Sequence, residues 1–511
     1  MSGITVHSSR THVLRLTLPL LAVLGGVLVA RLPLSAAVGA FGVGAVVAGA
    51  LIEPALGLIV LLAVAPWAAW QNTYLPGLLP TDAGQLTVAL VLGAWAVRGL
   101  IRREFEIPRM ALLVPLSIFT GWAAITMLWA PDYSSGLPEV LKWIEMILIA
   151  LFAVDVVRRR GARWIVAGLL LSAAVQALVG IYEARLRGVG PEGFLLSEGV
   201  YRAYGTFEQP NPFGGFIGLN LPVAIGLMLA VWGSTWQART TWQMAGGRWR
   251  VLRLTFYVSL VSFVVLLLAA ALYLSFSRGA WLGAAAALLA MGLFLPRRRW
   301  IGLALIGGLI AIGLGLYSAN LLPASIADRF ADAGALVDFR DVRGVKINDA
   351  NYAVVERLAH WQAAVRMIEA HPWTGVGFSN YQPVYEQYRL LNWPLPLGHA
   401  HNIYLNVAAE TGLPGLLAYL GLWVAVFALT IRALGWLSGV NRWPAPDRGS
   451  RWLALGLLGA WVHLSVHHVF DNLYVNNVHL HIGAMIGLLS AIGAGAAVRN
   501  PDRSHREHAA P

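Results

Sequence analysis

Apolar runs of about twenty residues recur along this 511-residue chain and are separated by short polar stretches. A bilayer core needs about twenty apolar residues of helix, and a helix pairs its own backbone groups there. The pattern therefore predicts an all-α polytopic membrane protein with about 12–14 transmembrane helices. The runs lie near residues 12–30, 34–51, 54–70, 85–101, 110–130, 139–157, 164–182, 212–232, 254–276, 279–296, 300–320, 403–431, 452–471 and 477–497.

The spacing of the polar stretches predicts the organisation of the chain. One of them, 321–400, is long enough to form a helical loop outside the membrane. Within it, apolar residues spaced three and four apart predict a helix over 349–370, capped by Asp349 or Asn351, with its stripe on the membrane surface or the outer face of the bundle. We expect N-terminal membrane helices in 1–182, central ones in 183–320 with an outer loop at 183–211, the large extracytoplasmic loop at 321–400, C-terminal membrane helices in 401–498 and a cytoplasmic tail at 499–511.

Basic residues indicate the orientation of the helices. If both termini are inside, 24 of the 37 Lys and Arg residues fall on the inner side. Seven of the other 13 lie in the loop 321–400, and long loops barely follow the positive-inside rule. Every short inner connection except the one around Glu53 carries a basic cluster. This distribution predicts cytoplasmic termini, with 183–211 and 321–400 outside.

Composition excludes several classes of protein. The chain is 58% hydrophobic and only 12% charged, whereas soluble domains are about a quarter charged. Its net charge of +12 is dispersed in clusters between apolar runs, which is typical of membrane topology and not of nucleic-acid binding. The absence of Cys excludes disulfides and thiol chemistry. We find no phosphate-binding Gly-rich loop, HExxH helix or nucleophile elbow, and expect no cofactor.

Three arginines are candidate ligands on the outer side, Arg278 and Arg357 for a phosphate or diphosphate and Arg202 as a possible further substrate ligand. Arg278 lies in SFSRGA between two membrane runs, Arg357 lies in the expected outer helix, and Arg202 is a lone cation in YRAYGTFEQPNPFGG. A guanidinium can bind phosphate or diphosphate through two parallel N–H groups. Two simpler readings stay open: Arg278 reaches lipid phosphates, and Arg357 pairs along its own helix or lies over Trp361.

Histidines form two further candidate groups. The stretch GHAHNIYLNVAAETGLPG places His399, His401, Asn402 and Tyr404 where polar sequence meets an apolar run, so they are either a helix cap or functional groups. Further along, His463, His467 and Asp471 share one helix face at i, i+4 and i+8. That spacing permits a metal site. We favour polar residues beneath an outward cavity, with His467 and Asp471 as substrate ligands, and expect no metal.

The ordered set SFSRGA, ERLAHWQAA, HPWTGVGFSNY and HNIYLNVAAETG closely resembles the bacterial O-antigen ligase and O-antigen polymerase superfamily of membrane glycosyltransferases. His401, Asn402 and Gly412 match its pattern of His, Asn, nine residues and Gly. RAYGTFEQPNPFGG is similar to the way its members begin a membrane helix. The resemblance covers roughly 200–420 well and the first half only as a hydropathy pattern.

This resemblance implies a GT-C-like, metal-independent enzyme. It would transfer a glycan from a polyprenyl-diphosphate carrier, such as undecaprenyl diphosphate, to an acceptor hydroxyl at the outer face of the cytoplasmic membrane. Arg278 and Arg357 would bind the diphosphate, and His401 would serve the acceptor, since an ordinary imidazole pKa near 6.5 suits a general base. His399 competes for that role, and Asn402 and Tyr404 would fix the ring or the acceptor. The acceptor stays open among glycan, lipid A-core and protein hydroxyls.

A lipid-linked oligosaccharide flippase, or another transporter, is the alternative function. Transporters place charges in mid-membrane and are built from two related halves. Here the candidate groups cluster at one face after residue 200, and Glu145 is the main membrane charge outside that cluster. The distribution favours a transferase.

Overall fold

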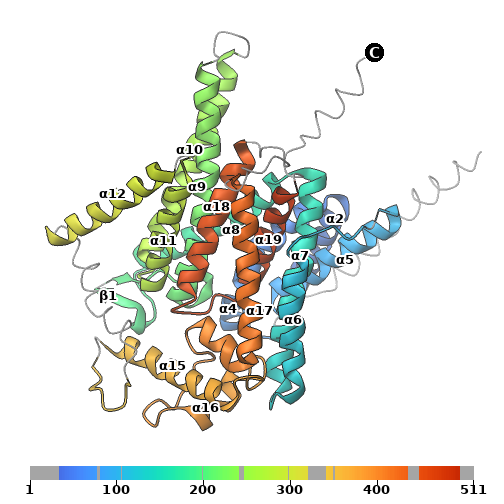
Figure 1. Cartoon of the computed structure of the whole chain (residues 1–511). Helices are drawn as coiled ribbons and strands as arrows, with labels where there is room; N and C mark the ends of the chain where they lie inside the picture. The colour runs from blue at the N-terminus through green and yellow to red at the C-terminus, as the bar shows by residue number, and fades with distance from the viewer. Residues whose placement is uncertain are drawn as a thin grey trace, which may run out of the picture.

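The computed structural model describes residues 34–77, 81–104, 106–197, 199–240, 247–296, 299–319, 341–348, 351–435 and 448–494. Long helices dominate this part of the chain and stand together in a bundle, with the shorter α15 and α16 at one end (Figure 1). The described part is therefore all-α and polytopic, as the hydropathy pattern predicted. The predicted first run, residues 321–340 of the large loop and the tail 499–511 lie outside the described residues.

The helix bounds follow the apolar runs closely. Within the described residues, six segments have the length and apolarity to cross a membrane: Pro54–Tyr74, Ala83–Arg102, Arg163–Arg185, Pro210–Trp232, Thr255–Leu274 and Ile403–Ala433. The total of 12–14 remains a prediction. The α-helices are α2 Leu34–Ile52, α3 Pro54–Val64, α4 Ala68–Tyr74, α5 Ala83–Arg102, α6 Leu113–Thr126, α7 Tyr133–Arg160, α8 Arg163–Arg185, α9 Pro210–Thr240, α10 Gly247–Leu274, α11 Arg278–Phe294, α12 Arg299–Ser318, α15 Tyr352–Ala370, α16 Tyr381–Tyr388, α17 Ile403–Ala433, α18 Arg448–His467 and α19 Val478–Gly493.

Short elements connect the helices. The loop after α8 contains the 3₁₀ turns Glu192–Phe194 and Gly205–Phe207 and an antiparallel pair of strands, β1 Leu195–Ser197 and β2 Val200–Tyr201. Two further 3₁₀ turns, Ala65–Trp67 and Met127–Trp129, follow α3 and α6. The loop 183–211 is thus a shaped segment, as its Gly and Pro content indicated.

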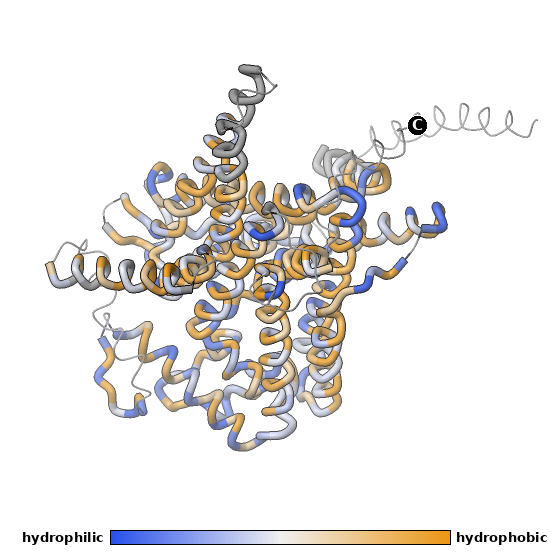
Figure 2. The backbone as a smooth tube through the Cα atoms, turned by 45° about the horizontal axis from the view of Figure 1, so that its top comes forward, coloured by the Kyte–Doolittle hydropathy of each residue, from blue (hydrophilic) through white to orange (hydrophobic). Residues whose placement is uncertain are grey.

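The bundle core joins distant parts of the sequence. Helix α18 packs on α9 and α11, and α19 packs on α7. Apolar residues follow the long helices, while polar residues gather at helix ends and in the α15–α16 segment (Figure 2). This distribution is typical of a protein whose helices face lipid and whose ends meet water.

Helix α15 confirms the helix predicted over 349–370 and begins one residue after Asn351. Its buried residues Val354, Leu358 and Trp361 pack with Leu390 and Trp393 of the loop after α16, and Leu405 at the start of α17 adjoins this cluster. Of the two expected positions for its apolar stripe, the structure shows contact with the bundle, through α17. We call residues 351–402, which contain α15 and α16, the outer segment, after the side of the membrane predicted for them.

A tight turn after α15 locks this segment to a break in α17. Gly412 interrupts the helix with φ 70° and ψ 179°, a backbone conformation that suits glycine. The freed groups pair with the turn: the Leu413 N–H donates to the Pro372 carbonyl at 2.7 Å, and the Gly377 N–H donates to the Glu410 carbonyl at 2.9 Å. A Cβ on Gly412 would lie 2.6 Å from the Trp373 carbonyl. The HPWTGVGFSNY motif and Gly412 thus position the outer segment.

Candidate functional site

Arg278 is the first residue of α11, and Ser277 occupies the N-cap position. The turn SFSRGA joins α10 to α11, so the first N–H groups and the positive dipole end of α11 lie at the Arg278 backbone. The Ser277 N–H is itself bound by the Ser275 hydroxyl at 3.2 Å. A guanidinium beside a helix N-terminus makes this turn favourable for an anion.

Arg202 fastens the loop 183–211 to the same turn. Its Nε donates to the Ser275 carbonyl at 3.0 Å, and its Nη2 donates to Asn211 Oδ1 at 3.1 Å. One residue on, the Ala203 N–H donates to the Leu274 carbonyl at 2.8 Å. Arg202 therefore lies against the Arg278 turn, although it is 73 positions from Ser275 in the sequence.

Arg357 approaches from the outer segment. Its Nη1 donates to the Ala353 carbonyl one turn earlier in α15 at 3.0 Å, and its Nε donates to the Phe470 carbonyl in the loop after α18 at 3.2 Å. These bonds orient the side chain toward the junction of α15 with the α18–α19 loop.

The three arginines line one cavity of about 240 Å³. The structure thus brings Arg278 and Arg357 together on its wall, with Arg202, His467 and Asp471 beside them. Two carboxylates, those of Glu356 and Asp471, share the wall with the three guanidinium groups. The full lining is Arg202, Asn211, Phe276, Ser277, Arg278, Gly279, Ala353, Val354, Glu356, Arg357, His467, Phe470 and Asp471.

His401 lies next to this cavity, behind Asp471. Its Nδ1 is 3.6 Å from Asp471 Oδ1, while His399 Nε2 is 3.8 Å from the same oxygen. The backbone of His401 has φ 53°, which costs a non-glycine residue about 1–2 kcal/mol. Bonds on both sides hold it there: the Ala400 N–H donates to Asn406 Oδ1 at 3.0 Å, and the Ile403 N–H donates to the His468 carbonyl at 2.9 Å.

His399 supports His401 directly. The His401 N–H donates to His399 Nδ1 at 3.0 Å, so that nitrogen carries no proton and a neutral His399 holds its proton on Nε2, facing Asp471. Burial, reinforced by the neighbouring His401 and Arg357, lowers the pKa of His399 to about 4. His399 is therefore neutral near pH 7.

Asp471 is the charged member of this group. Burial by itself would raise the pKa of its carboxyl, but the contact with His401 and the nearby imidazoles of His399 and His467 more than offset burial and hold the pKa below its ordinary value. Asp471 is thus an anion that faces both histidines and the arginine cavity.

Neither ring nitrogen of His401 has a hydrogen-bond partner within the described residues, and both are shielded from solvent. Buried polar atoms without a partner are rare in folded proteins and call for an explanation. A bound ligand with a hydrogen-bonding group would supply such a partner.

Asn402 and Tyr404 make bonds within the protein. The Asn402 side chain caps α17 by accepting from the N–H groups of Tyr404 and Leu405 at 3.0 and 3.1 Å. The Tyr404 hydroxyl donates to the Ser465 carbonyl in α18 at 2.8 Å. Both residues fix the start of α17, and hence the loop that carries His401.

The histidines of α18 lie beneath the cavity. His463 Nε2 is 3.0 Å from the Gly215 carbonyl of α9, and its ring stacks on that of His467 with centroids 5.7 Å apart. Only His467 reaches the cavity wall. For His463, His467 and Asp471 the sequence favoured polar packing beneath a cavity over a metal site.

The side chains that could bind a metal together are not the set that the sequence spacing suggested, which was His463, His467 and Asp471. Within the described residues, the ligand atoms of His399, His401 and Asp471 lie within 4.8 Å of one another. Imidazole and carboxylate groups can bind a transition metal. Metal independence therefore stays a prediction that a chelator can test.

Sequence reasoning passed over Asn211, Glu356 and Phe470, which also line the cavity. Asn211 lies in the QPNPFGG stretch and Glu356 adjoins Arg357. Both are next to features already chosen from the sequence, and this proximity could have identified them. The sequence could not identify Phe470, because its contact with Arg357 is made by its backbone carbonyl, which every residue type has.

This arrangement defines an integral membrane protein with an arginine-lined cavity where helix α15 meets the helix bundle. Residues 263–420 match the family model described as O-antigen ligase. Over 97 residues the chain is 36% identical to an O-antigen ligase of Pseudomonas aeruginosa, which is 19% of this chain and 21% of that protein. The aligned stretch thus spans about a fifth of the curated relative. Both findings confirm the resemblance to the O-antigen ligase superfamily.

The family match includes some of the candidate residues and not others. Arg278, Arg357, His399 and His401 fall within 263–420, whereas Arg202, His467 and Asp471 lie outside it. The cavity therefore combines residues of the matched region with residues from both flanking regions.

Proposed function

We propose that this protein is a membrane glycosyltransferase of the O-antigen ligase or polymerase type. It moves a glycan from a polyprenyl-diphosphate carrier to an acceptor hydroxyl at the outer face of the cytoplasmic membrane. The observation that carries the proposal is the single cavity in which Arg202, Arg278 and Arg357 converge beside Asp471. The family match supports glycan chemistry.

The arginines stabilise the leaving group. When the bond between the anomeric carbon and the diphosphate oxygen breaks, negative charge grows on the diphosphate. Guanidinium groups fixed around that charge stabilise the transition state more than the ground state. The N-terminus of α11 adds its positive dipole end at Arg278.

His401 acts as the general base in the same displacement. The acceptor oxygen attacks the anomeric carbon, its proton passes to His401 Nε2, and the diphosphate leaves with the bonding electrons. Asp471, 3.6 Å from His401 Nδ1, stabilises the imidazolium that forms. His399 holds the His401 backbone N–H and keeps the ring beside Asp471.

The proposal also covers the acceptor and the route by which the donor reaches the cavity. The acceptor is a glycan, a lipid A-core or a protein hydroxyl, and the cavity lining carries no pattern that selects one of them. The donor enters from the membrane, because its polyprenyl chain stays in lipid.

Incubation of the purified protein with a polyprenyl-diphosphate glycan and each acceptor tests the proposal. Release of polyprenyl diphosphate together with a lengthened acceptor is the expected result. In sealed proteoliposomes, donor that changes leaflet with no diphosphate released would instead identify the transporter alternative. A parallel reaction in EDTA should run at the same rate, and loss of activity that Zn²⁺ or Mn²⁺ restores would assign a metal to His399, His401 and Asp471.

A further inference from the structure

A second cavity lies at the other end of α7. At its start, the Asp132 N–H bonds Asn380 Oδ1 of the outer segment at 2.8 Å. At its end, Asp155, Arg159 and Arg160 line a cavity of about 330 Å³. A 28-residue helix is about 42 Å long at 1.5 Å per residue, so this cavity is separate from the arginine site. On the predicted topology it faces the cytoplasm.

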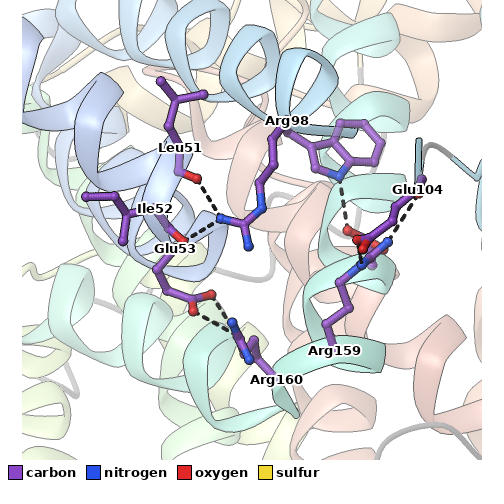
Figure 3. Close-up of polar contacts among 9 residues, drawn as sticks. Leu51, Ile52, Glu53, Arg98, Glu104, Arg159 and Arg160 are labelled. Carbon is purple, nitrogen blue, oxygen red and sulfur yellow. Dashed lines mark hydrogen bonds and ion pairs between the residues drawn. The ribbon is translucent and has the colours of Figure 1, made fainter. Parts of the chain in front are cut away.

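Most charges in this cavity neutralise one another. It contains four arginines and four acidic residues. Arg159 pairs with Glu104 at 2.7 Å and with Asp155 at 2.8 Å, and Arg160 pairs with Glu53 at 2.8 Å (Figure 3). Among the lining residues this leaves Arg98, Arg102 and Glu106 outside these ion pairs.

Arg98 and Arg102 lie one turn apart on α5, and like charges at that spacing repel. Arg98 Nη1 donates to the carbonyls of Leu51 and Ile52 at the end of α2, at 2.6 Å for Leu51 (Figure 3). Within the part of the chain that the structure describes, its Nε and Nη2 have no bond and Arg102 has no ion pair. Two guanidinium groups thus face the cavity and can bind an anion.

The residues that adjoin the lining residues in sequence are apolar and exposed. Ile52 precedes Glu53 and is 74% exposed, and Leu100 and Ile101, between Gly99 and Arg102, are 67% and 76% exposed. On membrane helices such residues contact acyl chains. A ligand that carries both a phosphate and acyl chains would match both features, whereas a soluble anion would leave these apolar side chains without a partner.

We propose that this cavity binds the headgroup of a membrane phospholipid. Its phosphodiester lies against Arg98 and Arg102, and its acyl chains follow Ile52, Leu100 and Ile101. Glu106, on the same wall, accepts a hydrogen bond from a headgroup hydroxyl. An anionic lipid with hydroxyl donors, of the phosphatidylglycerol kind, satisfies all three features.

Native mass spectrometry of the purified full chain, titrated with dioleoyl phosphatidylglycerol, tests this site. Arg102→Gln should weaken lipid binding at least fivefold, and Arg98→Gln with Arg102→Gln should weaken it further. Arg163→Gln is the matched control, because Arg163 is an exposed arginine at the same end of the bundle that does not line the cavity. It should change binding less than twofold.

Arg98 also holds the end of α2, so its replacement can disturb folding. Arg102→Gln alone keeps the test decisive, since Arg102 is exposed and its variant should melt at the wild-type temperature. Unchanged lipid affinity in Arg102→Gln would overturn the proposal. So would full displacement of the lipid by equimolar sn-glycerol 3-phosphate, which would make the cavity a site for soluble anions. Glycan transfer plays no part in either readout.

Discussion

His401 combines a strained backbone with a ring that has no protein hydrogen bond in the described part of the chain. We expect His401→Ala to lower turnover at least 100-fold, because a positioned general base contributes about 10²–10⁴ to the rate. Donor affinity should stay within about twofold, since the arginines hold the diphosphate. Turnover and donor binding, measured separately on purified protein, check both parts.

His399→Ala is the comparison for this variant. It removes the acceptor of the His401 N–H bond and keeps the His401 ring, so a smaller loss of turnover is expected. Near-normal turnover in His401→Ala would remove that residue from the chemistry. So would a loss of donor binding with normal turnover per bound donor.

The guanidinium shape matters at Arg278 and Arg357. Lysine keeps the charge and loses the two parallel N–H groups that bind a phosphate. We expect Arg278→Lys or Arg357→Lys to reduce kcat/KM at least tenfold, about 1.4 kcal/mol of transition-state stabilisation. Initial rates of polyprenyl-diphosphate release measure this effect.

Arg163→Lys provides the control for those variants, since Arg163 lies at the opposite end of the bundle. Its rate should match that of the wild type. Full activity with lysine at both cavity positions would show that Arg278 and Arg357 act only as membrane-facing cations.

At the scale of elements, the break in α17 at Gly412 holds the outer segment in place. Alanine there meets both a strained φ of 70° and the Trp373 carbonyl at 2.6 Å, so Gly412→Ala should destabilise the protein by about 2 kcal/mol or more. Gly421 lies on the same helix with open space around it, so Gly421→Ala should be neutral or slightly stabilising. Thermal melting of both variants makes the comparison. Equal melting temperatures would contradict the docking role of the break.

The contact of α15 with α16 should be sensitive to acid. His360, in α15, lies against Tyr381 of α16 with Nδ1 3.0 Å from the hydroxyl. Burial, reinforced by His401 and His399, lowers the pKa of His360 to about 3, whereas an unfolded histidine titrates near 6.5. Between these values the unfolded chain binds a proton that the folded chain does not. Stability is therefore complete above pH 6.5 and falls as the pH drops toward 3.

His360→Gln removes this titration. The slope of unfolding free energy against pH, between pH 6.5 and 4, should become shallower by up to about 1.4 kcal/mol per pH unit. Denaturant or thermal unfolding at several pH values measures the slope. An unchanged slope would show that protonation of His360 does not limit acid stability.

At the scale of the whole molecule, the predictions concern orientation. If 24 of 37 basic residues mark the inner side, reporters fused within 331–345 and 186–192 should be active only outside the cytoplasm. Reporters fused after residue 103 or 160 should be active only inside. A cytoplasmic reporter that is active within 331–345 would place the arginine cavity on the wrong side for the proposed reaction.

The sequence by itself determined which segments are helices and roughly where they end. The reason is local: an apolar run in lipid must satisfy its backbone groups within itself, so hydropathy alone specifies the element. The helix 349–370 was found in the same way, from spacing, and the structure places it at Tyr352–Ala370. Residue types also marked Arg202, Arg278, Arg357 and His401 as candidates.

Only the tertiary structure decided how these candidates are grouped. Arg202 contacts the Arg278 turn, Arg357 contacts the loop after α18, and Asp471 faces His399 and His401, each through packing between segments far apart in the chain. Such contacts depend on which helix faces meet, and hydropathy does not encode this. Asn402 shows the same limit: its position beside His401 suggested a role at the ring, yet its side chain caps α17, because the first N–H groups of that helix need a partner.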